Sequence, residues 1–201
     1  MYDFLEVDSI YHNINSSLTL NDIYIKCNYG QTVGIIGRNG CGKSTLLNII
    51  FGSIKVRDKH VRINSNLIKK PYNYISLLPQ EHFLPLQCKV STIISLLFNK
   101  SSIEAIISNK FIKTHLNTKI KFLSRGELKY LELILILNLK SKFILLDSPF
   151  DYLSPKTIDI VKSLILNSKK GIIISESNPN NIYDICDSIY HLNNGSLKKM
   201  I

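Results

Sequence analysis

A glycine-rich segment in the first quarter of the chain has the residue types and spacing of a phosphate-binding loop. Residues 37–45, GRNGCGKST, fit the pattern G-x-x-x-x-G-K-[ST]. The glycines allow a tight turn in which successive backbone N–H groups face phosphate oxygens, and a helix that starts there adds the positive end of its dipole. Lys43 would place its charge at the β- and γ-phosphates of a nucleotide, and the Ser44 hydroxyl would coordinate Mg²⁺. The residues predicted to hold the nucleotide here are Gly37, Asn39, Gly40, Cys41, Gly42, Lys43, Ser44 and Thr45.

An acidic residue at the end of an apolar stretch is the second candidate for chemistry. Residues 143–146 read FILL, and Asp147 follows them. A buried strand of this kind would bring the carboxylate to the carboxyl edge of a parallel sheet, where it can hold the metal through water. An Asp at a strand end is common by itself, so this prediction depends on the phosphate-binding loop upstream.

Alternating strand and helix patterns predict the elements that position these residues. Two early strands, 4–10 and 23–25, alternate apolar and polar residues around a polar turn at 13–17. Asn194-Gly195 predicts a hairpin near the end of the chain. Together the elements predict an α/β layered core. Further strands are expected at 31–36, 61–63, 74–78, 143–146 and 171–175, and helices at 43–51, 91–98 with Ser91 as N-cap, 102–113, from Ser124 to 139, and from Pro155 to 166.

Length and composition limit the class of protein. With 201 residues and 45% hydrophobic content, one domain is expected, with or without a small inserted subdomain. No apolar run reaches the roughly 18–20 residues of a membrane span, and the acidic N-terminus does not resemble a signal peptide. We therefore expect a cytosolic protein. The four scattered cysteines are interpreted as free thiols.

The net charge of +10 could indicate a nucleic-acid or anionic-membrane partner. Almost all of it comes from Lys, in a chain that is also rich in Ile and Asn. This combination is typical of an AT-rich genome. Since the chain has no RNA-binding aromatic motif and no basic helix, a nucleic-acid partner is not expected.

Five landmarks in a fixed order carry a specific resemblance that covers nearly the whole chain. Residues 20–49 resemble the start of an ATP-binding subunit of an ABC transporter, including its phosphate-binding loop. Residues 78–81, LPQE, resemble the Q-loop, and residues 123–127, LSRGE, resemble the LSGGQ signature. Residues 146–150, LDSPF, resemble the Walker B segment, and residues 151–154 follow in the place of the D-loop.

The resemblance implies a P-loop NTPase fold of the RecA-like type. This fold has a mainly parallel sheet flanked by helices, an N-terminal antiparallel β subdomain and an inserted helical subdomain. The expected organisation is a single ABC ATP-binding domain over residues 1–201, with the helical subdomain at about 85–139. Only 43 residues, 81–123, separate Gln80 from Ser124, so this subdomain should be compact.

Further roles are carried over by the resemblance to matching positions. Tyr11 would stack on adenine, although a strand-core tyrosine is the alternative. Gln80 would contact Mg²⁺ or the attacking water and link the site to the helical subdomain. Ser124 and Gly126 would cap the γ-phosphate of ATP held by a second subunit, although Ser124 and Glu127 also form a capping box by their spacing. The implied ligands are ATP and Mg²⁺, the metal being held by Ser44, Gln80 and Asp147.

The sequence departs from the family pattern at positions that matter for hydrolysis. Family members place Glu after the Walker B Asp, where this chain has Ser148, and a hydroxyl cannot act as a base near neutral pH. The switch histidine is replaced by Ser177, or by Glu176 if the count shifts by one, and Ser154 replaces the D-loop Asp. A positioned base is worth about 10²–10⁴ in rate, so slow turnover is expected unless Glu176 supplies the carboxylate.

The resemblance leaves three functions open. The first is the ATP-binding subunit of a transporter, peripheral on the inner face of the membrane, which dimerises around ATP with a second ABC ATP-binding subunit, identical or homologous. It would drive an integral membrane permease docked near the apolar residues 83–86. The alternatives are a non-hydrolysing ATP-gated binding module and a soluble ABC ATPase, for example one of iron–sulfur assembly.

Overall fold

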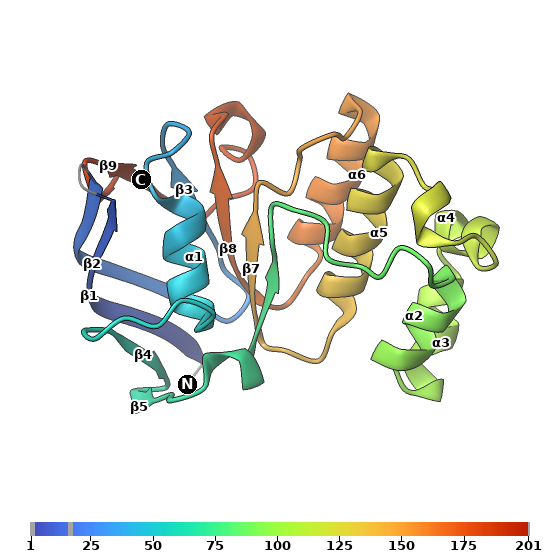
Figure 1. Cartoon of the computed structure of the whole chain (residues 1–201), viewed down its shortest axis with the longest axis horizontal. Coiled ribbons are helices and arrows are strands. Elements are labelled where there is room, and N and C mark those ends of the chain that lie inside the picture. Colours follow the sequence, from blue (N-terminus) through green and yellow to red (C-terminus); the bar gives the residue numbers. More distant parts are fainter. Residues whose placement is uncertain (1–2, 16–17, 201) are drawn as a thin grey trace.

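A six-stranded sheet forms the centre of the α/β fold, and the computed structural model describes residues 3–15 and 18–200 of the chain (Figure 1). Its strand order is β10-β9-β3-β8-β7-β6, with β10 antiparallel to β9 and the other neighbours parallel. Every residue of β3, β7 and β8 is buried, because the sheet is covered on both faces. The sequences of such parallel strands are therefore almost continuously apolar. The strands are β3 Thr32–Ile36, β6 Ile75–Leu78, β7 Phe143–Asp147, β8 Gly171–Glu176, β9 Ser188–Asn193 and β10 Ser196–Lys199.

A smaller antiparallel sheet contains the N-terminal strands, in the order β2-β1-β4-β5. Its strands are β1 Phe4–Asn15, β2 Leu18–Asn28, β4 His60–Ile63 and β5 Asn66–Leu67. The predicted polar turn at 13–17 is wrong in its first part: β1 continues to Asn15, where Asn13 pairs with Thr19 and Asn15 with Leu18. Ladder pairing with β2 outweighs the low strand preference of asparagine. Residues 16 and 17 of the predicted turn lie outside the described part of the chain.

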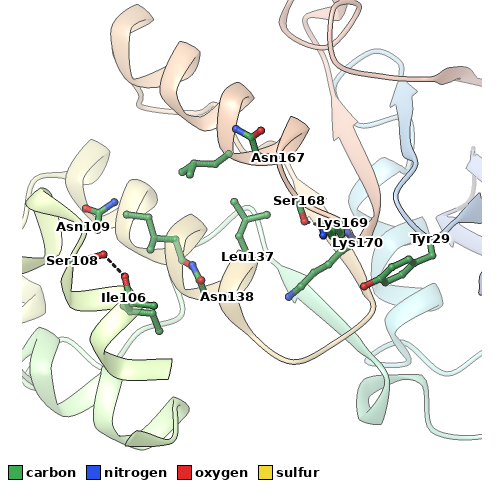
Figure 2. Close-up of a pocket in the computed structure, with 13 residues that line it drawn as sticks. Tyr29, Ile106, Ser108, Asn109, Leu137, Asn138, Asn167, Ser168, Lys169 and Lys170 are labelled. Carbon is green, nitrogen blue, oxygen red and sulfur yellow. Dashed lines mark hydrogen bonds between the residues drawn. The ribbon is translucent and has the colours of Figure 1, made fainter. Parts of the chain in front are cut away.

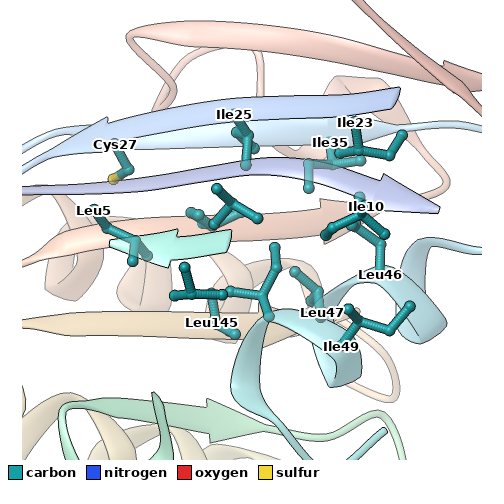
Figure 3. Packing of buried hydrophobic residues seen from close by; sticks show 14 of the residues in the cluster. Leu5, Ile10, Ile23, Ile25, Cys27, Ile35, Leu46, Leu47, Ile49 and Leu145 are labelled. Carbon is teal, nitrogen blue, oxygen red and sulfur yellow. The ribbon is translucent and has the colours of Figure 1, made fainter. Parts of the chain in front are cut away.

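Helix α1, Lys43–Phe51, lies between the two sheets and connects them through one hydrophobic core. Leu46, Leu47 and Ile49 of α1 pack among buried side chains of β1, β2, β3 and β7 (Figure 3). Gly52 ends the helix in the left-handed conformation (φ 95°), as the sequence predicts. The residues that begin α1 are therefore held in place by a core that spans both sheets.

Two helices cover the opposite face of the large sheet. Helices α5 Arg125–Asn138 and α6 Pro155–Leu166 pack on β7 and β8 in a second core, and the sequence predicted both helices. The predicted strands 31–36, 143–146 and 171–175 are also confirmed, as is the hairpin at Asn194-Gly195, where both residues have positive φ (47° and 77°). A third core joins α5 to the helices inserted between β6 and α5.

The inserted helices begin at other residues than the sequence predicts. They are α2 Val90–Leu97, α3 Lys100–Ile107 and α4 Lys110–His115. Ser91 is not an N-cap, because α2 starts one residue earlier and the amides of Val90 and Ser91 donate to the carbonyls of Thr118 and Leu116. The single helix predicted at 102–113 is two helices, because the side chain of Asn109 accepts from the amides of Phe111 and Ile112 and starts a new helix.

Among residues 3–15 and 18–200, no helix combines the length and hydropathy needed to cross a membrane.

Candidate functional site

The phosphate-binding loop lies between the end of β3 and the start of α1, at the carboxyl edge of the parallel strands. Gly40 and Gly42 have φ of 79° and 102°, a conformation in which a Cβ is strained. A Cβ on Gly37 would lie 2.5 Å from the carbonyl oxygen of Leu192, so β9 approaches too closely for any side chain. Within the described chain, no side chain caps α1 at Gly42. The first helical amides are thus available to an anion.

The ammonium group of Lys43 is buried among neutral oxygens. The residue is 6% exposed, and its Nζ donates to the carbonyls of Gly37 (2.7 Å) and Arg38 (3.1 Å) and to the Ser177 hydroxyl (2.9 Å). None of the ion pairs among the described residues includes Lys43. A desolvated cation without a carboxylate partner attracts an anionic ligand strongly.

A pocket of about 460 Å³ opens beside Lys43. It brings together most of the phosphate-binding loop with predicted residues from three distant segments. Ser44 and Thr45 of α1 face it, as do Gln80 after β6, Ser148 after β7 and Ser177 after β8. The residues that line it are Asn39, Gly40, Gly42, Lys43, Ser44, Thr45, Gln80, Ser148 and Ser177.

Asp147 lies at the end of β7 and is 2% exposed. Its Oδ1 accepts a 2.5 Å hydrogen bond from the hydroxyl of Ser175, its partner in the register of β7 and β8. This bond fixes the orientation of the carboxylate on the α1 face of the sheet. The sequence gives no signal for this role of Ser175, because the function of a serine inside an apolar strand becomes visible only when the neighbouring strand is known.

The two positions that the sequence resemblance aligned with a catalytic Glu and a switch His carry hydroxyl groups. Ser148 is 7% exposed and has a left-handed backbone (φ 47°), and its amide donates to the carbonyl of Ser175 at 3.0 Å. Ser177 donates from its hydroxyl to Asn39 Oδ1 at 2.5 Å while it accepts from Lys43. In the part of the chain that the structure describes, neither His nor a carboxylate lines the pocket.

Glu176 is not brought into the pocket. Side chains alternate along a strand, and β8 packs Ile173 in the α1 core but Ile172 and Ile174 in the α5–α6 core, so Glu176 belongs to the latter side. Its Oε1 accepts from the amides of Ser177 (2.8 Å) and Asn178 (3.3 Å), while Oε2 is buried without a partner among the described residues. Burial raises the pKa of this carboxyl above its ordinary value.

Gln80 connects the pocket to the D-loop and to α5. Its Nε2 donates to Asp151 Oδ2 at 3.3 Å, and its backbone carbonyl accepts from Lys129 Nζ at 2.8 Å. Lys129 was not among the residues predicted from the sequence. A signal for it was present, since this charged residue lies among the apolar residues of α5.

Tyr11 lies on β1 and does not line this pocket. The residue is 53% exposed, so the alternative interpretation, a strand-core tyrosine, is wrong. Its proposed stacking on adenine stays a prediction.

Ser124 and Gly126 line a separate pocket of about 640 Å³ at the start of α5. The predicted capping box is confirmed: the hydroxyl of Ser124 accepts from the amide of Glu127 (3.3 Å), whose carboxylate accepts from the amide of Ser124 (2.8 Å). The guanidinium of Arg125 lies 5.4 Å from the ring centroid of Tyr152 in the D-loop. A Cβ on Gly126 would lie 2.7 Å from the carbonyl oxygen of Tyr152, so this position requires glycine.

Figure 2 shows the residues that line a third pocket, of about 530 Å³. It is lined by the C-terminal residues of α5 and by Asn167, Lys169 and Lys170 after α6, and it shares no residue with the other two. The ammonium of Lys170 donates to the carbonyl of Leu139. Helix C-termini disfavour anions, so the phosphate site is better assigned to the pocket at Lys43.

Comparison with known proteins identifies the family. The ABC transporter family model matches residues 20–151. The chain is 31% identical to the lipoprotein-releasing system ATP-binding protein LolD of Rickettsia bellii, over 95% of this chain and 94% of the relative. It is 23% identical to the lipopolysaccharide export system ATP-binding protein LptB of Acidithiobacillus ferridurans, over 98% and 89%.

The fold of a solved ATP-binding subunit of an ABC transporter is also similar. That structure superposes with a TM-score of 0.87 at 21% identity, covering 98% of this chain and 89% of the other. Solved domains of the family share the parallel sheet with its helices and the antiparallel β subdomain that the sequence resemblance implied. The chain thus belongs to the ABC transporter family, as an ATP-binding subunit.

Proposed function

We propose that this chain binds ATP with Mg²⁺ in the pocket at Lys43 and hydrolyses it slowly, so that ATP acts chiefly as a signal for association. The observation that carries the proposal is the buried Lys43 ammonium, which has no ion-pair partner among the described residues. It lies beside a pocket lined by Ser148 and Ser177, the residues that the sequence resemblance aligns with a catalytic Glu and a switch His. Members of the family bind ATP and are typically ATP hydrolases.

The oxygen donors in and beside the pocket fit a magnesium ion. Ser44 and Gln80 line the pocket with a hydroxyl and an amide oxygen. Asp147 does not line it, but it directly precedes the lining residue Ser148 and supplies a buried carboxylate, and such hard oxygen ligands are those that Mg²⁺ prefers. Bound Mg²⁺ would neutralise charge on the β- and γ-phosphates. Ser175 would keep the Asp147 carboxylate oriented toward it through the hydrogen bond between them.

Slow hydrolysis follows from the chemistry of the lining residues. A serine hydroxyl at position 148 cannot take a proton from water near neutral pH. The buried carboxylate of Glu176 lies on the α5–α6 side of β8 and accepts from two backbone amides, so it is poorly placed to replace the base. The loss of a positioned base costs about 10²–10⁴ in rate.

Partners of two kinds complete the proposal. ABC ATPase subunits pair with permeases in transporters. We place the permease contact at the segment after β6, where Phe83 and Leu86 are 44% and 53% exposed. A second ATP-binding subunit would meet the pocket at Ser124 and Gly126, where helix-terminal amides can face a γ-phosphate. If that subunit retains Glu and His, this chain is the weakly hydrolysing half of an asymmetric pair.

Equilibrium binding of a fluorescent ATP analogue tests the central claim. In Lys43→Met, removal of the ammonium should weaken binding about 10- to 100-fold, the range expected when hydrogen bonds to a charged group are lost. The matched control is Lys113→Met, which changes an exposed lysine on α4 and should bind like the wild type. Equal affinity of all three proteins, or no binding by the folded wild type with Mg²⁺, would refute the proposal.

A further inference from the structure

Helix α5 buries two charged side chains in a position where an apolar pair would be expected. Lys129 and Glu132 are both 0% exposed. Removal of a charge from water is costly unless other groups pair with it, and apolar residues of similar volume are often as stable or more so. The packing of α5 therefore does not explain why charged residues occupy positions 129 and 132.

All hydrogen bonds that the structure gives these two side chains go to one segment, residues 79–83. Lys129 Nζ donates to the carbonyls of Gln80 (2.8 Å) and Pro79 (3.3 Å). Glu132 Oε1 accepts from the amide of Phe83 at 3.0 Å, and its Oε2 lies 3.0 Å from Nδ1 of His82. Burial lowers the pKa of Lys129, and the nearby carboxylates oppose this shift.

The geometry of a helix explains why the pair acts as one unit. Residues three apart lie on the same face, so Lys129 and Glu132 hold the two ends of one short segment against α5. Without regular secondary structure of its own, this segment depends on such contacts for its conformation.

The same segment extends into the phosphate pocket. The side chain of Gln80 lines the pocket and donates to Asp151, while its backbone carbonyl is held by Lys129. Ser124, the N-cap of α5, and Gly126 in its first turn line the second pocket. A rigid helix thus joins the two pockets through the 79–83 segment.

We propose that Lys129 and Glu132 are positioning residues that clamp the 79–83 segment to α5 and so place the Gln80 amide at the phosphate pocket. A displacement of α5 then moves Gln80 with it. This role rests on the proposed binding of ATP and Mg²⁺. It adds two residues that do not touch the nucleotide but determine how well the metal site is formed.

A tryptophan reporter makes the clamp measurable, since the chain contains no Trp. Phe83→Trp places one in the clamped segment, at a side chain that is 44% exposed. In this background we compare Lys129→Met and Glu132→Gln with the control Leu133→Ala, which removes a buried side chain of α5 from the α5–α6 core. The readouts are acrylamide quenching of the reporter's fluorescence and the ATP affinity with Mg²⁺ and with EDTA.

If Lys129 and Glu132 act as proposed, their substitution should weaken ATP binding in the presence of Mg²⁺ but not in EDTA. Lys129→Met should increase the quenching of the reporter and reduce the gain in ATP affinity that Mg²⁺ provides by about tenfold, the usual cost of disturbing a residue that supports a metal ligand. Its affinity for ATP in EDTA should stay within about twofold of the parent, since the phosphate-binding loop is unchanged. Leu133→Ala should alter neither the quenching nor the Mg²⁺ gain.

Two results overturn the clamp: an unchanged Mg²⁺ gain in the folded Lys129→Met protein, or an equal loss in Leu133→Ala, which would indicate general destabilisation. If Lys129→Met does not fold, Glu132→Gln decides by the same criteria. Failure of the parent to bind ATP in either buffer refutes the proposed function instead. The quenching comparison then still shows whether the segment is held by α5.

Discussion

At the scale of single residues, the pocket at Lys43 combines a buried ammonium group with hydroxyl groups at the two positions that the resemblance assigns to catalysis. Lys43 has three oxygen partners and no counter-ion among the described residues, while Ser148 and Ser177 offer only hydroxyl groups. Asp147 is oriented by Ser175, and Glu176 is directed to the other side of β8. The proposal of ATP binding with slow hydrolysis rests on this contrast between Lys43 and the two serines.

Introduction of a carboxylate at position 148 tests whether the absence of a base there limits ATP hydrolysis. Ser148→Glu should increase steady-state phosphate release, by at most about 10²–10⁴-fold, because a carboxylate there can accept the proton of the attacking water. The isosteric control is Ser148→Gln, which fills the same space without a base and should stay at the wild-type rate. A wild type that already hydrolyses ATP as fast as Ser148→Glu would contradict the assignment.

At the scale of elements, α5 has two functions that share its N-terminus. Ser124 caps the helix, and the same free end of the helix lines the second pocket. The apolar face of α5 contributes to the second and third cores, so the helix joins the inserted helices to the central sheet.

A comparison of two helix caps separates these functions. Ser124→Ala should lower the free energy of unfolding by about 1 kcal/mol, the usual cost of an N-cap. Asn99 is the N-cap of α3, and its Oδ1 accepts from the amide of Ser102. Asn99→Ala should therefore lower the free energy of unfolding by a similar amount. Chemical denaturation measures both costs. Only Ser124→Ala should also weaken ATP-dependent association of the subunits. If both variants associate equally well, Ser124 acts only as a helix cap and not in the contact with a second subunit.

At the scale of the whole molecule, the antiparallel sheet, the parallel sheet and the inserted helices follow one another along the long axis (Figure 1). Three hydrophobic cores connect them. The phosphate pocket and the pocket at the start of α5 open at different places and share no residue. This separation agrees with the proposal that the chain binds a nucleotide at Lys43 and meets the nucleotide of a second subunit at Ser124 and Gly126.

Association of the purified chain tests this organisation. With ATP and Mg²⁺, sedimentation should show a shift from 22.9 kDa to twice that mass, and the dimer should persist because hydrolysis is slow. Ser148→Glu should shorten its lifetime in ATP, since hydrolysis would remove the ligand that links the subunits. If the chain stays monomeric with ATP but dimerises with a homologue that carries Glu and His, the asymmetric pair is favoured over the homodimer.

Local sequence patterns were enough to predict most strands, the glycine-rich loop between β3 and α1, and the helices that begin at Lys43, Arg125 and Pro155. These features depend on residues close together in the chain: nine residues fix the loop, and local caps such as Ser124 and Ser154 fix helix starts. Local signals failed where distant backbone satisfied a polar group, as at Ser91, whose amide donates to the carbonyl of Leu116.

The contacts between residues that are distant in sequence could be seen only in the tertiary structure. Ser177 reaches Lys43 from 134 residues away, and Lys129 holds the carbonyl of Gln80 from 49 residues away. The tertiary structure also decided that Glu176 faces away from the pocket, since the side of a strand that meets the phosphate site is set by the packing of both faces of the sheet. Hydrogen bonds and burial act over a few ångströms in space, and only the folded chain brings such residues within that range.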